Sequence, residues 1–294
     1  MNTPSAPAGH DDTLMFAIVS DIHGNLEALT AVLDEIDRRK IDHIICLGDV
    51  VGYGPNPMEC LDLVSQRCRA TLMGNHDFAV FYEPYNFNSG AESASYWTRQ
   101  QFENDADGQR RANRWRFLGN LPVRIRTNEF VAVHASPRRP INEYIFPDDI
   151  YTNPTKFVSI FERFEHLCFV GHTHVPGVFL EGPDFYSPDE LDYRFELTDE
   201  KAIVNVGSVG QPRDRDPRSS FVVVHTPGDA SLDTAATDGL GDAGPKLLPP
   251  GNRPPAGGYV EFVRLPYDVE TTVRKVEAIA ELDNFLGTRL LDGR

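Results

Sequence analysis

The architecture of the chain follows from residues 14–48, which read LMFAIVSDIHGNLEALTAVLDEIDRRKIDHIICLG. The apolar run at 14–20 is typical of a buried strand. Residues 25–39 then repeat apolar side chains at helical spacing, with Asn25 able to cap the first turn and basic residues in the last. A second apolar run follows at 43–48. This order predicts a βαβ unit, in which a right-handed crossover joins two parallel strands.

Five more short apolar runs, each ending at a glycine or a polar residue, continue the strand pattern along the chain. They are ATLMG (70–74), FVAVH (130–134), LCFVG (167–171), AIVNVG (202–207) and FVVVH (221–225). The later runs lie close enough together in sequence to form hairpins. We therefore expect an α/β fold with a mixed pair of sheets and flanking helices, in preference to one doubly wound sheet.

Length and composition are those of a soluble globular protein. The 294 residues are 40% hydrophobic and 24% charged, which is enough to bury a core without disulfide bonds. Lys and Arg number 28 against 44 Asp and Glu, and the net charge of -16 disfavours non-specific nucleic-acid binding. No apolar stretch approaches the roughly 18 residues of a membrane-spanning helix, and the start of the chain lacks the pattern of a secretory signal. We expect a cytoplasmic protein without a membrane span.

The organisation along the chain predicts one main domain. We interpret 1–13 as a disordered N-terminal tail and 14–294 as a single domain, with a helical insertion at about 91–120. The Pro/Gly-rich segment at 226–258 is expected to be a flexible surface excursion. Residues 108–128 hold six arginines and no acid. We interpret them as a solvated helix face, and a docking surface for an acidic partner is the alternative.

Asp, His or Asn side chains come directly after five of the apolar runs. The segments are Asp21-Ile22-His23, Gly48-Asp49, Gly74-Asn75-His76-Asp77, His134-Ala135 and Gly171-His172-Thr173-His174. Loops beyond the carboxyl ends of strands meet at one edge of a sheet, so these segments can form one site. Carboxylates and imidazoles are ligands for divalent metals, and the glycines allow the backbone to approach a ligand closely.

Each segment also has a structural interpretation. A lone D-x-H or G-D is more often a turn or a helix cap, and two histidines at a strand end can be a satisfied surface pair. The string at 74–77 is more specific, because no turn requires its histidine. Five of the nine histidines fall in these segments, whereas His10, His43, His166 and His225 do not. The combination in this order indicates a metal site.

These segments resemble the calcineurin-like metallophosphoesterase superfamily over residues 14 to about 225, through the series D-x-H, G-D, G-N-H-D, H and G-H-x-H. Longer strings resemble its prokaryotic predicted phosphodiesterase branch, namely SDIHGNLEAL, LGDVVGYGPNP, VHASP and NVGSVGQPRD. The resemblance implies a four-layer α/β/β/α sandwich of two mixed sheets. It also implies two divalent metal ions, with Mn, Fe, Zn and Co as candidates, at one sheet edge.

The resemblance also implies a ligand set, carried over residue by residue. The first metal would be held by Asp21, His23, Asp49 and His174, and the second by Asp49, Asn75, His134 and His172. Asp49 would bridge the two ions. Such a pair lowers the pKa of a shared water toward neutrality, so the expected nucleophile is a metal-bridging hydroxide and no Ser or Cys is required.

His76 is assigned to neither metal. The resemblance implies that it stabilises the transition state and protonates the leaving oxygen as a general acid, with Asp77 orienting its ring. The alternative for Asp77 is that it caps the helix that follows. Four further residues near the expected site are candidates for substrate binding: Asn25, Arg138, Ser208 and Arg213. Each of these could equally be a turn residue or a surface charge. Tyr53 and Tyr144 could stack on a base or pack as ordinary wall residues.

The expected function is hydrolysis of phosphodiester or phosphomonoester bonds in a small phosphoester substrate, with nucleotides among the candidates. The sequence leaves the type of phosphoester, the metal and the oligomeric state open. The alternative is a non-catalytic metal-binding scaffold that contacts a partner through 108–128. Retention of His76 and of the whole implied ligand set favours the enzyme.

Overall fold

Two β-sheets pack face to face in the computed structural model, which describes residues 13–127, 129–227, 236–238 and 257–294. The first sheet has the order β3 (Ala70–Thr71), β2 (His43–Cys46), β1 (Thr13–Val19), β11 (Ser219–Pro227), β13 (Tyr259–Leu265) and β9 (Arg194–Glu196). The second has the order β12 (Ala236–Asp238), β4 (Arg124–Arg126), β5 (Val131–Val133), β6 (Leu167–Val170), β10 (Ala202–Asn205), β7 (Gly177–Leu180) and β8 (Asp184–Tyr186). Both sheets combine parallel and antiparallel pairs, as predicted.

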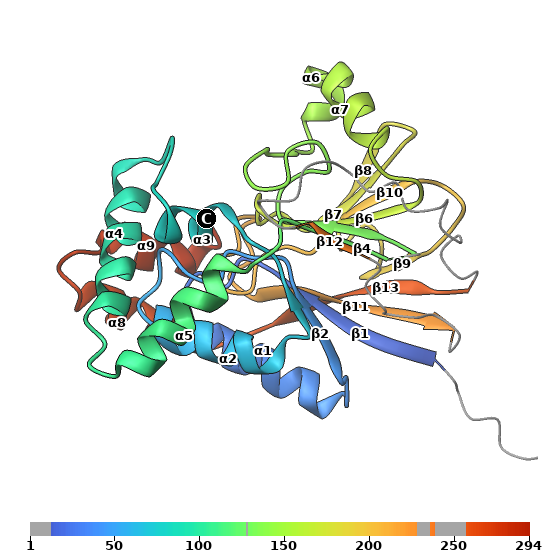
Figure 1. Ribbon diagram of the computed structural model, residues 1–294. Helices are drawn as coiled ribbons and strands as arrows, with labels where there is room; N and C mark the ends of the chain where they lie inside the picture. The colour runs from blue at the N-terminus through green and yellow to red at the C-terminus, as the bar shows by residue number, and fades with distance from the viewer. Residues whose placement is uncertain (1–12, 128, 228–235, 239–256) are drawn as a thin grey trace, which may run out of the picture.

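Helices cover the outer face of each sheet (Figure 1). On the first sheet these are α1 (Leu26–Arg38) and α2 (Pro57–Arg67), and on the second α6 (Asp149–Thr152) and α7 (Pro154–Phe161). The predicted four-layer α/β/β/α sandwich is confirmed. Strand β1 shows why the layers form, because its side chains alternate: Phe16 and Ile18 pack between the sheets, and Ala17 and Val19 pack toward the helices.

The βαβ unit is also confirmed, because β1 and β2 pair in parallel around α1. Asn25 caps α1 by accepting a hydrogen bond from the Ala28 N–H at 3.1 Å. The face of α1 toward the sheet carries a fully apolar stripe: Ala28, Leu29, Val32, Leu33 and Ile36 are all buried. Burial of this stripe holds α1 in place and directs the chain into β2.

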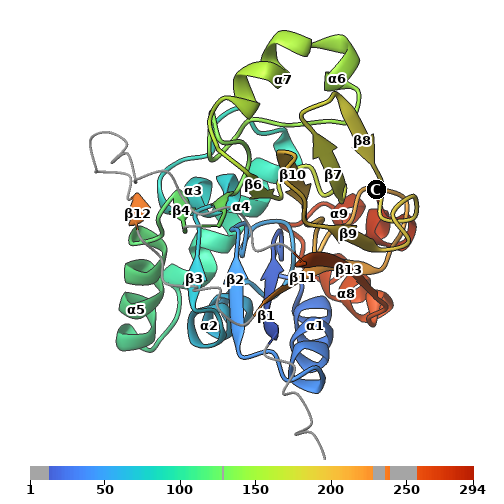
Figure 2. The ribbon, with the colours of Figure 1, turned by 90° about the vertical axis from the view of Figure 1, so that its right-hand side faces the viewer.

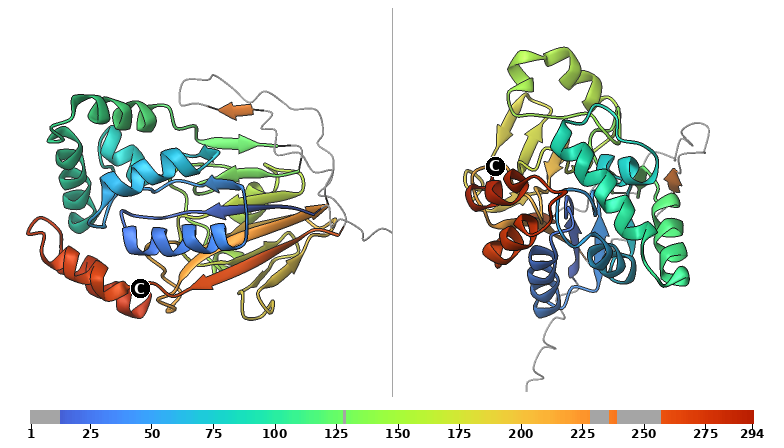
Figure 3. Two further views of the ribbon diagram at one scale, coloured as in Figure 1. Left: turned by 90° about the horizontal axis from the view of Figure 1, so that it is seen from below. Right: turned by 90° about the vertical axis from the view of Figure 1, so that its left-hand side faces the viewer.

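The remaining helices gather at one end of the sandwich (Figure 3, left), which is the end away from the viewer in Figure 2. They are α3 (Asn75–Phe81), α4 (Ser89–Glu103), α5 (Gly108–Gly119), α8 (Val269–Glu277), α9 (Asn284–Thr288) and the 3-10 helix η1 (Arg289–Asp292). Helices α4 and α5 occupy the region where the helical insertion is predicted. The C-terminal segment returns to the same body, because Val276 and Leu286 pack against Ala94 and Trp97 of α4.

Several sequence predictions fall at the edges of the described residues. Positions 1–12 of the predicted tail lie outside them, and Thr13 already begins β1. Most of the predicted excursion at 226–258 also lies outside them, although β11 extends to Pro227 and residues 236–238 form β12 beside β4. All four cysteines are free thiols, and three are buried. Among the described helices, none has the length and apolarity needed to cross a bilayer.

Candidate metal centre

The predicted ligands meet at the carboxyl ends of strands from both sheets. Asp21 and His23 follow β1, Asp49 follows β2, and Asn75 starts the helix after β3. His134 follows β5 of the second sheet, and His172 and His174 follow β6. Backbone hydrogen bonds connect these loops. The Gly210 N–H donates to the Asp21 carbonyl at 2.9 Å between the two sheets, and the Gly171 N–H donates to the His134 carbonyl at 2.9 Å within the second sheet. The expectation that scattered strand ends form one site is therefore met.

The ligand atoms form two groups that share Asp49. In the first, His174 Nε2 lies 3.0 Å from Asp21 Oδ1 and 3.2 Å from His23 Nε2. His23 Nε2 lies 3.7 Å from Asp49 Oδ2, which faces both groups. In the second group, His134 Nε2 is 3.3 Å from the same Asp49 oxygen and 3.1 Å from Asn75 Oδ1. The ligand atoms of Asp49, His134 and His172 lie within 4.8 Å of one another.

The second nitrogen of three imidazoles is anchored on the backbone. Nδ1 of His23 lies 3.3 Å from the Val51 carbonyl, Nδ1 of His134 lies 3.1 Å from that of Leu47, and Nδ1 of His174 lies 2.5 Å from that of Gln211. A carbonyl can only accept, so we assign the ring proton to Nδ1. In each ring that is neutral, Nε2 then carries a lone pair directed at the carboxylates. Such an arrangement is the usual one for metal-ligating histidines.

Each ligand carboxylate divides its two oxygens between the backbone and the centre of the site. Asp21 Oδ2 accepts the His172 N–H at 2.9 Å, and Asp49 Oδ1 accepts the His76 N–H at 2.8 Å. The other oxygens face the histidine lone pairs. Asp21 Oδ1 and His172 Nε2 are buried without a hydrogen-bond partner among the described residues. Lone pairs of buried acceptors facing one another are unfavourable unless a cation lies between them, so the donor set fits divalent metals.

The backbone at the site is strained. Asp21, His23, Asp49, His172 and His174 all have φ between 52° and 64°, in the left-handed region that non-glycine residues seldom adopt. Conformations of this kind persist where the surrounding structure enforces them, and they cluster at functional sites. Five of the seven predicted metal ligands are held in this way.

The predicted role of the glycines is confirmed by the lack of space around them. A Cβ at Gly74 would lie 2.1 Å from Asp49 Oδ1, and a Cβ at Gly171 would lie 2.4 Å from Asp21 Oδ2. Both distances are far below any real contact, so only glycine allows the loops to approach the ligand carboxylates.

Burial controls the charge of the histidines. It lowers the pKa of His172 to about 3. Burial and then the charge of Arg213 lower the pKa of His174 to about 4. Burial opposes protonation of His134 too, but the adjacent Asp49 carboxylate raises the pKa of His134 to about 9. A metal ion would displace that proton on binding, because only the neutral ring coordinates.

His76 lies beside the ligands in an aromatic enclosure. Its ring centroid is 4.3 Å from that of Tyr53 and 4.6 Å from that of Phe87, and the side chain is 4% exposed. Nδ1 has no hydrogen-bond partner among the described residues and lies against Gly52, where a Cβ would come within 2.6 Å of it. Burial lowers the pKa of His76 well below its ordinary value, so the ring is neutral at pH 7.

Asp77 supports the backbone and does not contact the His76 ring. Its carboxylate accepts N–H groups from Asp49 at 2.7 Å, Val50 at 3.0 Å and Val51 at 3.3 Å, and from Gly74 at 3.0 Å. Of the two interpretations made from the sequence, the helix cap describes the contact with Gly74. The same carboxylate also holds the backbone of residues 49–51. Burial and the charge of Asp49 raise the pKa of Asp77 to about 7.

Two of the four substrate-binding candidates are fully engaged inside the protein. Asn25 is 1% exposed, and its amide donates to the Gly210 carbonyl at 2.8 Å while its oxygen caps α1. Ser208 is fully buried and donates to the Asp21 carbonyl at 2.8 Å. Both residues hold the Asp21 loop in position, and this use of their polar atoms leaves no reason to place them on substrate.

The two arginine candidates differ from each other. Arg138 forms an ion pair with Glu143, with Nε 3.1 Å from Oε2, and so its charge is neutralised. Arg213 is half-buried with its guanidinium 5.9 Å from the centre of the Tyr53 ring, and it donates to Gln211 Oε1 at 2.7 Å. It carries no acidic partner among the described residues. Arg213 therefore stays a candidate for binding an anionic group.

The structure also brings residues to the site that the sequence did not reveal. Phe87, which packs on His76, is such a residue. Tyr144, a candidate from the sequence, stacks on His172 with the ring centroids 4.1 Å apart. The only signal for Phe87 in the sequence is an aromatic residue in a polar segment after the 74–77 motif, which is too common to be informative. The backbone carbonyls that anchor the histidines have no sequence signal.

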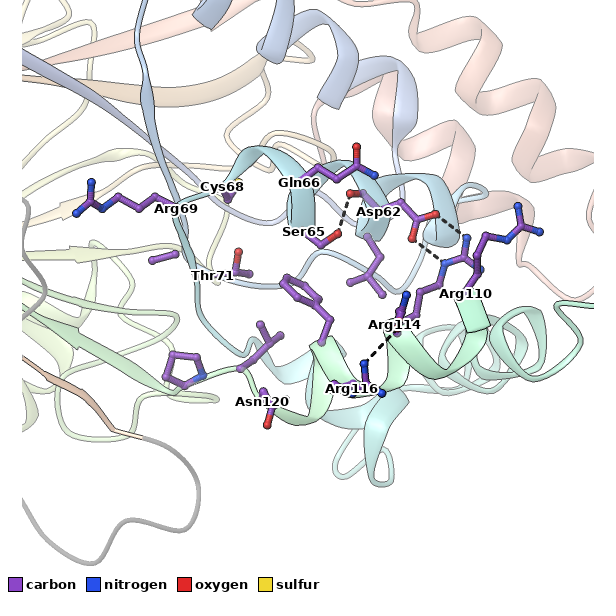
Figure 4. A pocket seen from close by; sticks show the side chains of 16 residues that line it. Asp62, Ser65, Gln66, Cys68, Arg69, Thr71, Arg110, Arg114, Arg116 and Asn120 are labelled. Carbon is purple, nitrogen blue, oxygen red and sulfur yellow. Dashed lines mark hydrogen bonds and ion pairs between the residues drawn. The ribbon is translucent and has the colours of Figure 1, made fainter. Parts of the chain in front are cut away.

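Three of the six arginines of 108–128, Arg110, Arg114 and Arg116, lie apart from the metal centre, around a cavity of about 730 Å³ between α2 and α5 (Figure 4). Arg114 is buried and forms ion pairs with Asp62 at 2.6 Å and Asp105 at 2.5 Å. Arg110 pairs with Asp105 at 3.1 Å. Acids outside the segment thus neutralise these charges. Exposed Arg110 fits the predicted solvated helix face, whereas buried Arg114 does not, and the ion pairs of both weaken the case for a docking surface for an acidic partner.

Comparison with known proteins assigns the chain to a family. The family model described as calcineurin-like phosphoesterase matches residues 14–176. The chain belongs to this family. An uncharacterized protein of Methanocaldococcus jannaschii is 33% identical over 287 residues, covering 95% of this chain and 98% of the relative. Members of the calcineurin-like phosphoesterase family depend on metals, in agreement with the clustered donors.

Two further similarities come from a solved structure and from a phosphatase. A crystal structure of a metallophosphoesterase from Sphaerobacter thermophilus is 33% identical, with a TM-score of 0.70 and coverage of 96% of this chain and 100% of that one. Serine/threonine-protein phosphatase 2 of Escherichia coli is 27% identical over 138 residues, which cover 45% of this chain and 62% of the relative. The phosphoester hydrolase class expected from the motifs is thereby supported.

Replacement of Gly171 by alanine is expected to weaken metal binding. The new Cβ would lie 2.2 Å from Ser20 Oγ and would displace Asp21, so the affinity for Mn²⁺ should fall by about 10- to 100-fold in a calorimetric titration. Gly182→Ala is the matched control, because the nearest atom to its Cβ is 3.5 Å away. Equal Mn²⁺ affinities for the two variants and the wild type would contradict the close approach at Gly171.

Proposed function

We propose that this chain is a dinuclear metal-dependent phosphoesterase that hydrolyses phosphodiester or phosphomonoester bonds. The proposal is carried by one observation: the donor groups Asp21/His23/His174 and Asp49/His134/His172 meet at Asp49 Oδ2, and a ring nitrogen of the buried His76 lies within 4.8 Å of ligand atoms of His23 and Asp49. Metal identity is left to the assay, with Mn, Fe, Zn and Co compatible with the donors. When bound, two such ions would supply a nucleophilic water at neutral pH and neutralise the phosphoryl oxygens.

The residues of the chain would prepare this chemistry in three ways. Asp21, Asp49 and the neutral histidines hold the ions in a site from which most water is excluded, since all are at most 4% exposed. Asp77 keeps the Asp49 loop in position through three of its N–H groups. Arg213 can pair with a phosphate oxygen, since a guanidinium binds phosphate in a fork geometry.

His76 is proposed to protonate the leaving oxygen. Nδ1 is enclosed by Gly52, so we assign Nε2 as the donor atom. Burial keeps the ring neutral in the free protein, but an anionic phosphoester beside it favours the protonated form. With substrate bound, the ring would therefore take up a proton from solvent and then donate it to the leaving oxygen, returning to the neutral form.

The alternative is a non-catalytic scaffold with a structural metal site. It gains little support from Arg110 and Arg114 of the 108–128 segment, whose charges are paired with Asp62 and Asp105. It also leaves the enclosure of His76 unexplained, because a structural metal site requires no buried proton donor beside it. We therefore favour the enzyme.

Hydrolysis is expected to depend on added metal. Protein stripped with a chelator should release no p-nitrophenolate from bis-p-nitrophenyl phosphate or p-nitrophenyl phosphate, and Mn²⁺ or Zn²⁺ should restore release from at least one of them. The ratio of the two rates reports the preference for diester or monoester. If none of the metal-loaded samples hydrolyses either compound, the scaffold alternative replaces the enzyme.

The variant His76→Ala should keep its metals but lose activity. Loss of a general acid lowers kcat by about 10²- to 10⁴-fold, whereas metal content measured by elemental analysis should stay at the wild-type level. His43→Ala, at the opposite end of β2 from the site, is the matched control and should retain full activity. Wild-type turnover in His76→Ala would remove this residue from the mechanism.

Asp49→Ala should lose both metals, because a single carboxylate oxygen serves both ligand groups. Elemental analysis of dialysed protein is the measurement. Asp34→Ala, an exposed position on α1, controls for the change of net charge and should keep both ions. Two ions retained in Asp49→Ala would show that the bridging assignment is wrong.

A further inference from the structure

A cavity of about 640 Å³ opens directly beside the metal centre. Its walls come from α3, from the connection between α3 and α4, and from residues 139–144 after β5. Asn75 and His172 belong both to the predicted second metal group and to the lining of this cavity. A phosphoester whose phosphate lies at the metal centre therefore places one of its substituents in the cavity. The volume falls within the roughly 300 to 1,000 Å³ of typical small-molecule sites, so it is larger than phosphate alone requires.

The cavity lining contains polar side chains that the protein does not use. Arg139, Asn86 and Asn142 are exposed, and their side chains make no hydrogen bond or ion pair with any described residue. Glu83, the acid of the lining, is already paired with Arg99 at 3.3 Å. Arg139 thus supplies an uncompensated positive charge, and the two amides supply donors and acceptors. These groups suit a ligand with a second anionic group and polar edges.

The aromatic lining has one fixed wall and one free ring. Tyr144 is held between its stacking partners, with centroid distances of 4.1 Å to His172 and 5.2 Å to Phe146. Tyr85 is 74% exposed, and its ring contacts no other aromatic ring in the described part of the chain. Exposing a tyrosine at the mouth of a cavity leaves its face available for a planar group. Stacking of this kind is the usual way in which proteins hold nucleobases.

From this lining we infer that the cavity binds a nucleotide-like substituent of the substrate, with its planar base stacked on Tyr85 and a second anionic group paired with Arg139. The inference rests on the proposed function for the position of the reacting phosphate. It makes Tyr85 and Arg139 specificity-determining residues, which act on binding and have no part in the chemical step. The neighbouring Arg138 does not share this role, because its guanidinium is paired with Glu143.

Binding is the first test, and it has a readout independent of turnover. Calorimetry on Mn²⁺-loaded and on metal-free protein compares adenosine 5′-monophosphate with adenosine 3′,5′-bisphosphate. Wild-type protein should bind the bisphosphate about tenfold more tightly, because a charge-assisted contact with Arg139 is added. Arg139→Ala should abolish that difference. Tyr85→Ala should weaken both ligands by about tenfold through loss of stacking.

The controls are Tyr151→Ala and Arg163→Ala. Tyr151 is 79% exposed on α6, and Arg163 is exposed beyond α7, and neither lines the cavity. Both variants should bind the two nucleotides as the wild type does. Unchanged nucleotide affinity in Tyr85→Ala and Arg139→Ala, or equal losses in the control variants, would overturn the inference.

Turnover separates this inference from the proposed function. Thymidine 5′-(p-nitrophenyl phosphate) and methyl p-nitrophenyl phosphate release the same chromophore, and only the former carries a base. The wild type should hydrolyse the nucleotide ester with a kcat/KM at least tenfold higher, and Tyr85→Ala should remove the advantage through KM. Equal kcat/KM values with metal-dependent hydrolysis intact would overturn the nucleotide inference alone. Nucleotide affinities that fall in Tyr85→Ala and Arg139→Ala as predicted, without hydrolysis of any ester, would support the cavity assignment and overturn the proposed enzymatic function.

Discussion

The rest of the structure depends on a buried meeting of two carboxylates with imidazole lone pairs. Asp21 and Asp49 lie beneath the surface with one oxygen each directed at Nε2 atoms of His23 and His174. Water does not reach these atoms, so their mutual repulsion would be costly without cations. The left-handed backbone, the glycine contacts and the Nδ1 anchors all keep the donors in this geometry. The left-handed conformations cost free energy of folding, and the structure tolerates that cost to keep the donors in place before any metal binds.

The order of the layers and the ligand set could be predicted from the sequence because both depend on short local patterns. An apolar run followed by Asp21, or by Gly171 and His172, marks a strand and its functional end within a few residues. The uses of Asn25 and Ser208 could not be predicted in this way. Both lie near the ligand motifs, but their partners, Gly210 and Asp21, are remote in sequence and are chosen by tertiary packing.

Arg138 and Arg139 also show that the sequence does not predict which partner a side chain contacts. The sequence places both cations after the His134 segment, and their order alone does not tell which is neutralised. The bend of the loop brings Glu143 to Arg138 and leaves Arg139 on the cavity wall. Likewise no motif singles out Tyr85 or Phe87, which lie in the connection between α3 and α4. In the structure Phe87 packs on His76 and Tyr85 lines the cavity. Side-chain direction in loops is set by contacts that no local pattern encodes.

The division of the ligands between the sheets has a consequence for how the protein holds together. One half of the donor set extends from the β1 and β2 side of the sandwich, and the other half from β5 and β6. Bound ions would act as cross-links joining two halves that otherwise adhere through apolar packing. Ligand binding to the folded state alone contributes about 2.7 kcal/mol at a free concentration 100 times the dissociation constant. Metal supply would then affect the thermal stability of the protein together with its chemistry.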